Sequence, residues 1–339
     1  RKWKNKILVT GPNANNQSIL GDWHKPQPDE NVHTIYEGIE KIGTEIGYIV
    51  DYHDSNQNIK KISSNDINKT IEIANQYDIV FVVVGDNSMR YKWSEKTAGE
   101  NTARAELNLA GKQLDLVKRL KETGKNIIVI YANGRPISEP WISENINAII
   151  EVWEPGSFGG LAAAEIIFGK VNPSGKLPLT IANSVGQLKM FYNHKHSMYY
   201  RNYAMNTNKP LYSFGFGLSY TKFEISEPKL NSSKFKKGIL SVSVDVKNIG
   251  DISGDEIVQL YISDKYSSIT RPVKELKAFK RVSLKSGESK EITFELDKSA
   301  FAYYDSEMKY IVEAGEFNIL IGNSSRDEDL KSTNFNIEE

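Results

Sequence analysis

Glu100 carries the side chain that this sequence places best for moving a proton. It lies in a loop at 99–107 with the order Gly-Glu-x-x-x-Arg, after the apolar run at 79–84 and before a helix-like stretch at 111–123. Open α/β sheets place their reactive groups on loops at the carboxyl ends of buried strands. A carboxyl group there can donate a proton to a leaving group or accept one from water. The simpler interpretation is a solvated surface glutamate, because glutamate side chains are mostly exposed.

The loop around Glu100 extends over residues 85–110, beyond the length at which structureless loops become uncommon in compact domains. Further loops at 11–23, 133–136 and 153–157 follow other strand-like segments. Together these loops are rich in Trp, Arg and Glu. Aromatic faces stack on pyranose rings and charged groups bind sugar hydroxyls, so this set of loops indicates a sugar site.

The elements that must position these loops alternate between strand and helix in the first half of the chain. Strand-like segments lie at 6–10, 48–52, 79–84, 126–131 and 148–152, and helix-like segments at 33–42, 65–76, 111–123 and 159–168. This alternation predicts a mostly parallel sheet with helices on both faces. Right-handed crossovers then bring the strand-to-helix loops to one edge of the sheet.

The second half has a different pattern. After about residue 223 the apolar residues alternate with period two, as in Leu240-Ser241-Val242-Ser243-Val244, and turn signals separate about seven short strands. Such a pattern predicts a β-sandwich. Residues 186–222 between the halves are rich in Tyr and Phe, so we expect an ordered connector there rather than a flexible linker.

Composition excludes several classes of function. Lys and Arg (43) balance Asp and Glu (43), which argues against a nucleic-acid or anionic-membrane partner, and no apolar stretch reaches the roughly 20 residues of a membrane span. The absence of cysteine and of an HExxH pattern predicts no metal site. No Gly-x-Gly-x-x-Gly or Walker A pattern follows a strand, so we expect neither a nucleotide-binding domain nor a cofactor.

The N-terminus predicts a fragment or a processed product. The chain opens Arg1-Lys2-Trp3-Lys4-Asn5 and enters a strand at once, without an initiator Met or a signal peptide. We expect it to begin at a domain boundary.

Five segments in order carry a resemblance across the whole chain: 6–14, 133–136, 172–178, 211–223 and 271–279. With the loop at 99–107, they resemble the second and third domains of bacterial family-3 glycoside hydrolases, the β-glucosidase group. The resemblance implies an α/β sandwich domain at 1–185, the connector at 186–222 and a fibronectin type III-like β-sandwich at 223–339. It also favours a periplasmic or secreted bacterial protein over a cytoplasmic one.

The resemblance further implies retaining hydrolysis of β-linked oligosaccharides or glycosides. That chemistry needs two carboxyl groups about 5–5.5 Å apart. In this family the nucleophile is an Asp on an N-terminal (β/α)8 barrel, and the α/β sandwich domain supplies the acid/base Glu. This sequence contains no barrel. The expected partner is therefore a barrel domain supplied upstream or as a separate chain, and the chain alone should be inactive.

Carried onto this sequence, the family arrangement assigns the acid/base role to Glu100. Glu95 is the alternative, because the loop is longer than usual and shifts the alignment. Arg104 would orient the loop or pair with a carboxylate, the simpler interpretation being a surface cation. Trp23 resembles the family's stacking tryptophan at an outer subsite, with buried packing as its alternative. Trp93 and Arg90 are further candidates for substrate binding.

Two interpretations remain open. One is the C-terminal half of a β-glucosidase-type hydrolase, and the other is a carbohydrate-binding or scaffolding fragment without chemistry of its own. An upstream barrel that carries a catalytic Asp would favour the first. Both gluco- and xylo-configured sugars fit. We also expect the segment Asn133-Gly134-Arg135-Pro136 to be a structural turn in which Gly134 permits backbone conformations with positive φ.

Overall fold

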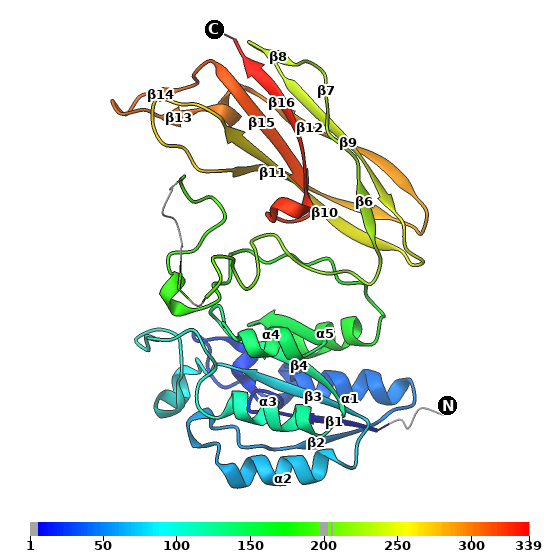
Figure 1. Cartoon of the computed structure of the whole chain (residues 1–339). Coiled ribbons are helices and arrows are strands. Elements are labelled where there is room, and N and C mark those ends of the chain that lie inside the picture. Colours follow the sequence, from blue (N-terminus) through cyan, green and yellow to red (C-terminus); the bar gives the residue numbers. More distant parts are fainter. Residues whose placement is uncertain (1–5, 197–202, 205, 339) are drawn as a thin grey trace. The chain divides into compact units, whose positions relative to one another are not determined.

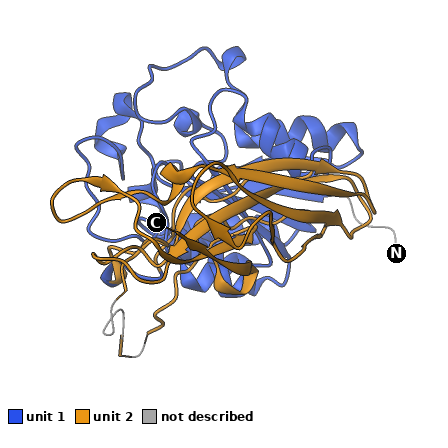
Figure 2. Cartoon of the chain, turned by 90° about the horizontal axis from the view of Figure 1, so that it is seen from above, with its two compact units in different colours: residues 1–171, 183–186 blue, residues 172–182, 187–339 orange. Residues whose placement is uncertain are grey.

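The computed structural model describes residues 6–196, 203–204 and 206–338, which form two compact units (Figures 1 and 2). The first comprises residues 1–171 with 183–186, and the second comprises residues 172–182 with 187–339. Residues 1–5, on which the expectation of a fragment rests, lie outside the described residues. Residues 197–202 and 205 of the expected connector do so as well.

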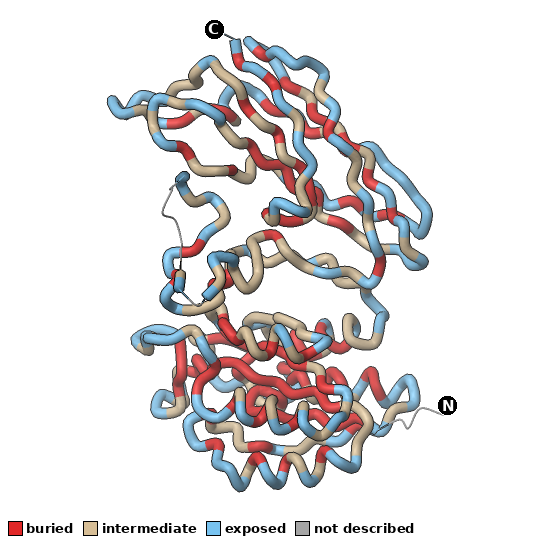
Figure 3. Tube along the Cα trace, in the orientation of Figure 1, coloured by how far each residue is buried: buried red, intermediate tan, exposed pale blue. Residues whose placement is uncertain are grey.

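The first unit is built on a parallel sheet of five strands in the order β2-β1-β3-β4-β5. The strands are β1 (Lys6–Thr10), β2 (Ile49–His53), β3 (Ile79–Gly85), β4 (Asn126–Ala132) and β5 (Ala148–Trp153). The central strand β3 is the apolar run of the sequence, and all its residues after Ile79 are buried (Figure 3). Continuous apolar strands are typical of parallel sheets that are covered on both faces.

Helices cover both faces of this sheet (Figure 1). On one face, α1 (Ile35–Glu45) and α5 (Gly159–Ile167) pack against Val9 and Phe81. The other face, which includes Leu8 and Val82, is covered by the helices α2 (Ser64–Ala74), α3 (Gln113–Glu122) and α4 (Pro140–Asn145). The sequence did not predict α4, because a helix of 6 residues is too short to show helical periodicity.

Glycine lets α1 and α5 approach closely. A Cβ atom on Gly38 would clash with the carbonyl of Gly160, and one on Gly160 would clash with the carbonyl of Thr34. Thr34 also begins α1: its hydroxyl accepts the N–H of Glu37, and the Glu37 carboxylate accepts the N–H of Thr34. This capping box satisfies two N–H groups at the helix start. It thereby defines where the long loop after β1 ends.

The second unit is a β-sandwich with one sheet in the order β11-β10-β15-β16-β8 and another in the order β12-β9-β6, with β7 pairing β9. Its core includes Leu240, Val242 and Val244, the alternate residues of β9. The strands are β6 (Phe223–Ile225), β7 (Lys229–Leu230), β8 (Lys234–Phe235), β9 (Leu240–Asn248), β10 (Gly254–Asp264), β11 (Glu275–Leu284), β12 (Ser289–Leu296), β13 (Tyr303–Tyr304), β14 (Tyr310–Ile311), β15 (Gly315–Gly322) and β16 (Leu330–Ile337). The predicted fold class, a parallel α/β domain followed by an all-β sandwich, is confirmed.

Short 3-10 helices occur in the loops of both units. They are η1 (Gln17–Leu20), η2 (Asp29–Asn31), η3 (Ile59–Lys61), η4 (Arg90–Glu95), η5 (Val185–Gln187), η6 (Lys298–Phe301) and η7 (Asp327–Asp329). Among the described residues, no helix is both long and apolar enough to cross a membrane.

The described residues of 187–222, within the expected connector, group with the second unit, and so do residues 172–182, which precede the connector. Within 172–182, Lys176 pairs with Glu256 at 2.8 Å, and Asn172 donates to the carbonyl of Ser253 at 2.9 Å. Ile181 and Tyr212 form an isolated antiparallel bridge within the same unit. The domain boundaries predicted at 185 and 222 refer to parts of the chain that would fold independently. They stay a prediction.

Candidate functional site

The loop between β3 and α3 is tied to the sheet at its first residue. The carboxylate of the buried Asp86 lies 2.8 Å from the guanidinium of Arg135, which is in the loop after β4. Thr97, further along the same loop, donates its hydroxyl to Asp86 at 3.0 Å and accepts the N–H of Asn87. The buried charge of Asp86 therefore joins two neighbouring loops at the carboxyl edge of the sheet.

Glu100 lies at the outer part of this loop, with 44% of its side chain exposed. Its carboxylate forms an ion pair with Arg90, which belongs to η4 in the same loop. The guanidinium of Arg90 also lies over the ring of Trp23, with 3.6 Å between its central carbon and the ring centroid. One arginine therefore connects the predicted acid/base residue with the predicted stacking residue.

Trp23 is exposed rather than packed. It lies in the loop after β1 and is 76% exposed, so the alternative of buried packing is wrong for this residue. Trp93 is 51% exposed, and the amine of Lys96 lies 4.8 Å from its ring centroid. Trp23 thus presents ring surface next to the loop that carries Glu100, and Trp93 does so from within that loop.

Glu95 and Arg104 make local contacts. Glu95 lies 4.0 Å from the amine of Lys92 within η4. Arg104 donates to the main-chain carbonyl of Asn108 at 3.0 Å, a contact that fits orientation of the loop. The structure thus brings Glu100, Arg90 and Trp23 together and places Glu95 in an ion pair of its own.

Asp22 and Lys96 are the site residues that the sequence did not reveal. Lys96 is 1% exposed, and its amine donates to both carboxylate oxygens of Asp22 at 3.1 Å and to the carbonyl of Glu100 at 3.0 Å. Asp22 also accepts the N–H of Glu100 at 2.6 Å. The one available signal was that Asp22 directly precedes Trp23. Lys96 fits no motif.

Glu154 links the loops that follow the other strands. Its carboxylate accepts the hydroxyl of Ser88 at 2.7 Å. A Cβ atom on Gly21 or on Gly134 would lie 2.6 Å from a carboxylate oxygen of Glu154. Gly134 does not use the positive φ that glycine permits. The Glu154 carboxylate occupies the space beside Gly134, so a side chain at this position would have to displace that carboxylate.

Glu151, on β5, is a second acidic residue near this edge of the sheet. Its carboxylate accepts the N–H of Trp153 at 2.9 Å and lies 3.5 Å from the amide nitrogen of Asn133. Burial raises the pKa of the Glu151 carboxyl to about 8, although both hydrogen bonds act in the opposite direction. The group is therefore mostly protonated at neutral pH.

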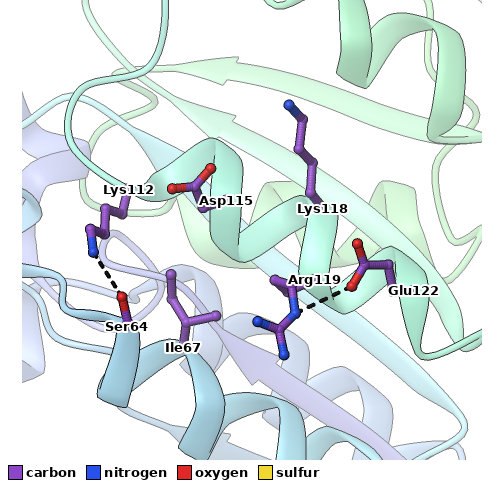
Figure 4. A pocket seen from close by; sticks show the side chains of 7 residues that line it. All are labelled: Ser64, Ile67, Lys112, Asp115, Lys118, Arg119 and Glu122. Carbon is purple, nitrogen blue, oxygen red and sulfur yellow. Dashed lines mark hydrogen bonds and ion pairs between the residues drawn. The ribbon is translucent and has the colours of Figure 1, made fainter.

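Two depressions lie elsewhere. A groove of about 260 Å³ between α2 and α3 contains none of the candidate residues. Two of the cations that line it have partners in the groove: Lys112 donates to Ser64, and Arg119 pairs with Glu122 (Figure 4). A cavity of about 580 Å³ in the second unit is lined by rings such as Tyr192 and Phe216. These rings stack on Phe214 and Tyr212, respectively, rather than leaving both faces open. Neither place contains any of the candidate residues, whereas the loop after β3 combines the carboxyl group of Glu100 with the exposed ring of Trp93.

The fold and this loop together define a class. An exposed tryptophan beside a carboxylate, at the carboxyl edge of an α/β sheet in a chain that also contains a β-sandwich, is the composition of a carbohydrate-active module. The model of the glycosyl hydrolase family 3 C-terminal domain matches residues 1–220, and that of the fibronectin type III-like domain matches residues 256–325. The chain belongs to glycosyl hydrolase family 3, as the resemblance predicted.

Its relatives are hydrolases of β-linked sugars by name. A β-xylosidase of Formosa agariphila is 37% identical over 98% of this chain and 46% of its own length. A periplasmic β-glucosidase of Salmonella typhimurium is 35% identical over 93% of this chain and 44% of its own length. The structure of a mutant β-glucosidase from Listeria innocua in complex with laminaribiose superposes with a TM-score of 0.89, at 31% identity over 99% of this chain and 46% of that one. The chain thus spans about half the length of the curated relatives it matches.

Proposed function

We propose that this chain is the acid/base-bearing part of a retaining β-glycosidase and that Glu100 is its general acid/base. The observation that carries the proposal is the position of Glu100: an accessible carboxyl group on the loop after β3, connected through Arg90 to the exposed ring of Trp23. Family membership supports the same reaction class.

The proposed reaction has two steps. In the first, a nucleophilic carboxylate attacks the anomeric carbon while Glu100 gives its proton to the departing glycosidic oxygen. In the second, the Glu100 carboxylate takes a proton from water, and that water displaces the enzyme carboxylate from the anomeric carbon. The nucleophile would come from an Asp of a (β/α)8 barrel supplied upstream or as a separate chain.

The ion pair with Arg90 suits the second step, because a neighbouring positive charge favours the charged carboxylate. The first step needs a neutral carboxyl group at the same place. The negative charge of the nucleophile would favour that form, since like charges in one cleft disfavour joint ionisation. Arg90 then has two proposed roles, to hold Glu100 and to contact the sugar.

The proposed substrate is a β-linked oligosaccharide or glycoside. The names of the relatives include both a β-xylosidase and a β-glucosidase, so gluco- and xylo-configured sugars both remain candidates. Trp23 would stack on an outer sugar ring, with Trp93 as a further aromatic contact. Arg104 would keep the loop in place through its bond to the main chain.

The alternative is a carbohydrate-binding or scaffolding fragment without chemistry. The exposed rings of Trp23 and Trp93 fit that function as well. It differs from the first proposal in needing no acid group, so replacing Glu100 would leave its function intact.

Azide rescue in a protein that also contains the barrel tests the proposal. Glu100→Ala should slow substrates with poor leaving groups most, because they need protonation, and added azide should restore the second step by replacing water as the attacking species. Glu95→Ala is the matched control in the same loop and should behave as wild type. Rescue of Glu95→Ala, with Glu100→Ala unaffected, would transfer the acid/base role to Glu95. Full activity of both variants would show that neither glutamate is the acid/base, and would favour the alternative in which this chain only binds carbohydrate.

A further inference from the structure

We propose that Lys96 and Asp22 form a clamp on the main chain of Glu100 and are positioning residues for its carboxyl group. This inference deepens the proposed function and rests on it. The clamp consists of the side chains of Asp22 and Lys96 together with the N–H and C=O groups of Glu100. Neither side chain needs to touch the sugar.

The clamp grips Glu100 on both sides of its Cα atom. Asp22 accepts the N–H of Glu100 at 2.6 Å, and Lys96 donates to the carbonyl of Glu100 at 3.0 Å. The two side chains are joined to each other by contacts of 3.1 Å to both carboxylate oxygens. Because both main-chain groups of Glu100 are held, the position from which its side chain extends is fixed.

Burial makes the clamp stiff. The Lys96 side chain is 1% exposed and that of Asp22 is 12% exposed, so water screens the pair weakly. The lysine amine has three protons, and the three contacts to Asp22 and Glu100 account for them. A buried lysine is uncommon unless it is paired. Here the pairing serves the main chain of a single residue.

Gly99 shows that the loop is shaped to reach Asp22. Its φ of +98° lies in the left-handed region, and a Cβ atom there would lie 2.6 Å from the carboxylate of Asp22. The φ angle favours glycine immediately before Glu100. A side chain at this position would also have to displace the Asp22 carboxylate, which accepts the N–H of Glu100.

The clamp also joins the acid/base loop to the stacking residue. Asp22 directly precedes Trp23, and Arg90 lies 3.6 Å from Asp22 while it pairs with Glu100. Glu100 and Trp23 come from loops after different strands, and these contacts fix their positions relative to each other. An error of about 1 Å in such a placement can cost about 100-fold in rate.

The test uses the protein that contains the barrel and compares two kinds of leaving group. Because a single substitution leaves a buried charge without its partner, the double variant Asp22→Leu/Lys96→Met removes both charges together. We expect this variant to lose about 100-fold in kcat/KM, which reports the first step, on a substrate with a poor leaving group, such as a disaccharide. A dinitrophenyl glycoside, which leaves without a proton, should lose less than about threefold in kcat/KM.

Lys60→Met is the matched control. Lys60 is exposed and also donates to a main-chain carbonyl of this loop, that of Ser94 at 2.9 Å. It should leave both substrates unaffected. Equal losses of kcat/KM on both substrates in the double variant, or no loss in a folded double variant, would overturn the positioning role, because in the first step misplacement of the acid affects only the substrate that needs its proton.

Hydrogen exchange of the Glu100 amide separates this inference from the proposed function. The amide should exchange slowly in the unaltered protein and in Lys60→Met, and fast in the double variant. Fast exchange in the unaltered protein would overturn the clamp itself. A failure of azide rescue in Glu100→Ala would instead overturn the acid/base assignment. The exchange rate of the Glu100 amide does not depend on that assignment.

Discussion

At the scale of single residues, Glu151 is the acidic side chain whose pKa the fold shifts most clearly. Burial on β5 raises the pKa of its carboxyl from 4.5 to about 8. Its partners are the N–H of Trp153 and the amide of Asn133, and no cation among the described residues forms an ion pair with it. An uncompensated carboxyl group in such surroundings is held in its neutral form.

This pKa shift predicts a pH-dependent stability. Between pH 4.5 and about 8 the folded protein keeps a proton that the unfolded chain has released. The free energy of unfolding should therefore fall as the pH rises through this range, by up to about 1.4 kcal/mol per pH unit from this group. The stabilising contribution is complete below pH 4.5 and is lost above about pH 8.

Glu151→Gln should remove the contribution of this group to the pH dependence of the unfolding free energy, since glutamine does not titrate. Urea denaturation at several pH values between about 5 and 8 measures it. The exposed Glu144 supplies the control variant Glu144→Gln, which should keep the slope of the wild type. An unchanged slope in Glu151→Gln would show that the carboxyl group titrates normally.

At the scale of elements, the loop between β3 and α3 depends on the loop after β4. Arg135 pairs with the buried Asp86 and also donates to the carbonyl groups of Leu107 and Asn108, near the end of the same long loop. Both ends of the segment that contains Glu100 are thereby attached to one arginine. The apolar sheet forms the base, and this buried charge network determines the path of the loop above it.

Arg135→Met should therefore destabilise the protein by about 3–5 kcal/mol, the usual result of leaving one buried charge unpaired. The control is Arg119→Met on α3, whose ion pair with Glu122 is exposed on both sides and should be worth less than about 1 kcal/mol. Urea denaturation compares the two. Equal effects would mean that Asp86 finds other partners when Arg135 is removed.

At the scale of the whole molecule, each unit has a hydrophobic core of its own. The α/β unit has two clusters, one on each face of its sheet, and the sandwich has a third between its two sheets. Separate cores are the property that lets domains fold independently.

Limited proteolysis tests the domain boundaries predicted at 185 and 222. Cleavage should fall mainly within 185–225 and release pieces that correspond to the α/β domain and to the β-sandwich, because cores resist proteases better than connecting segments do. N-terminal sequencing of the products identifies the sites. Cuts mainly inside 60–160, with 185–225 spared, would contradict the division.

The 339-residue chain alone should hydrolyse no aryl β-glucoside at a meaningful rate. A single carboxylic acid cannot follow the covalent route of a retaining enzyme, which needs a second carboxylate as nucleophile. The measurement is release of the aryl group by the purified chain, with Glu100→Ala purified in parallel. Turnover that disappears in Glu100→Ala would show a complete active site within this chain, whereas turnover present in both would come from a contaminant.

The sequence by itself determined the fold class and most elements, because period and turn chemistry are local properties of the chain. The alternation of β9 and the apolar run of β3 are examples. It also put Glu100 on a loop after β3, since the order of strand, loop and helix can be read along the chain. The six-residue helix α4, the 3-10 helices and the two-residue strands were too short to predict.

The tertiary structure alone decided which side chains of different loops meet. Asp22 and Lys96 are 74 positions apart, and Gly134 meets Glu154 across two strand-to-helix loops. No period or motif records such pairs, because they depend on how loops from neighbouring strands close over one sheet edge. For the same reason the sequence left buried packing open for Trp23, and its exposure became evident once Arg90 and the loop after β3 were in place.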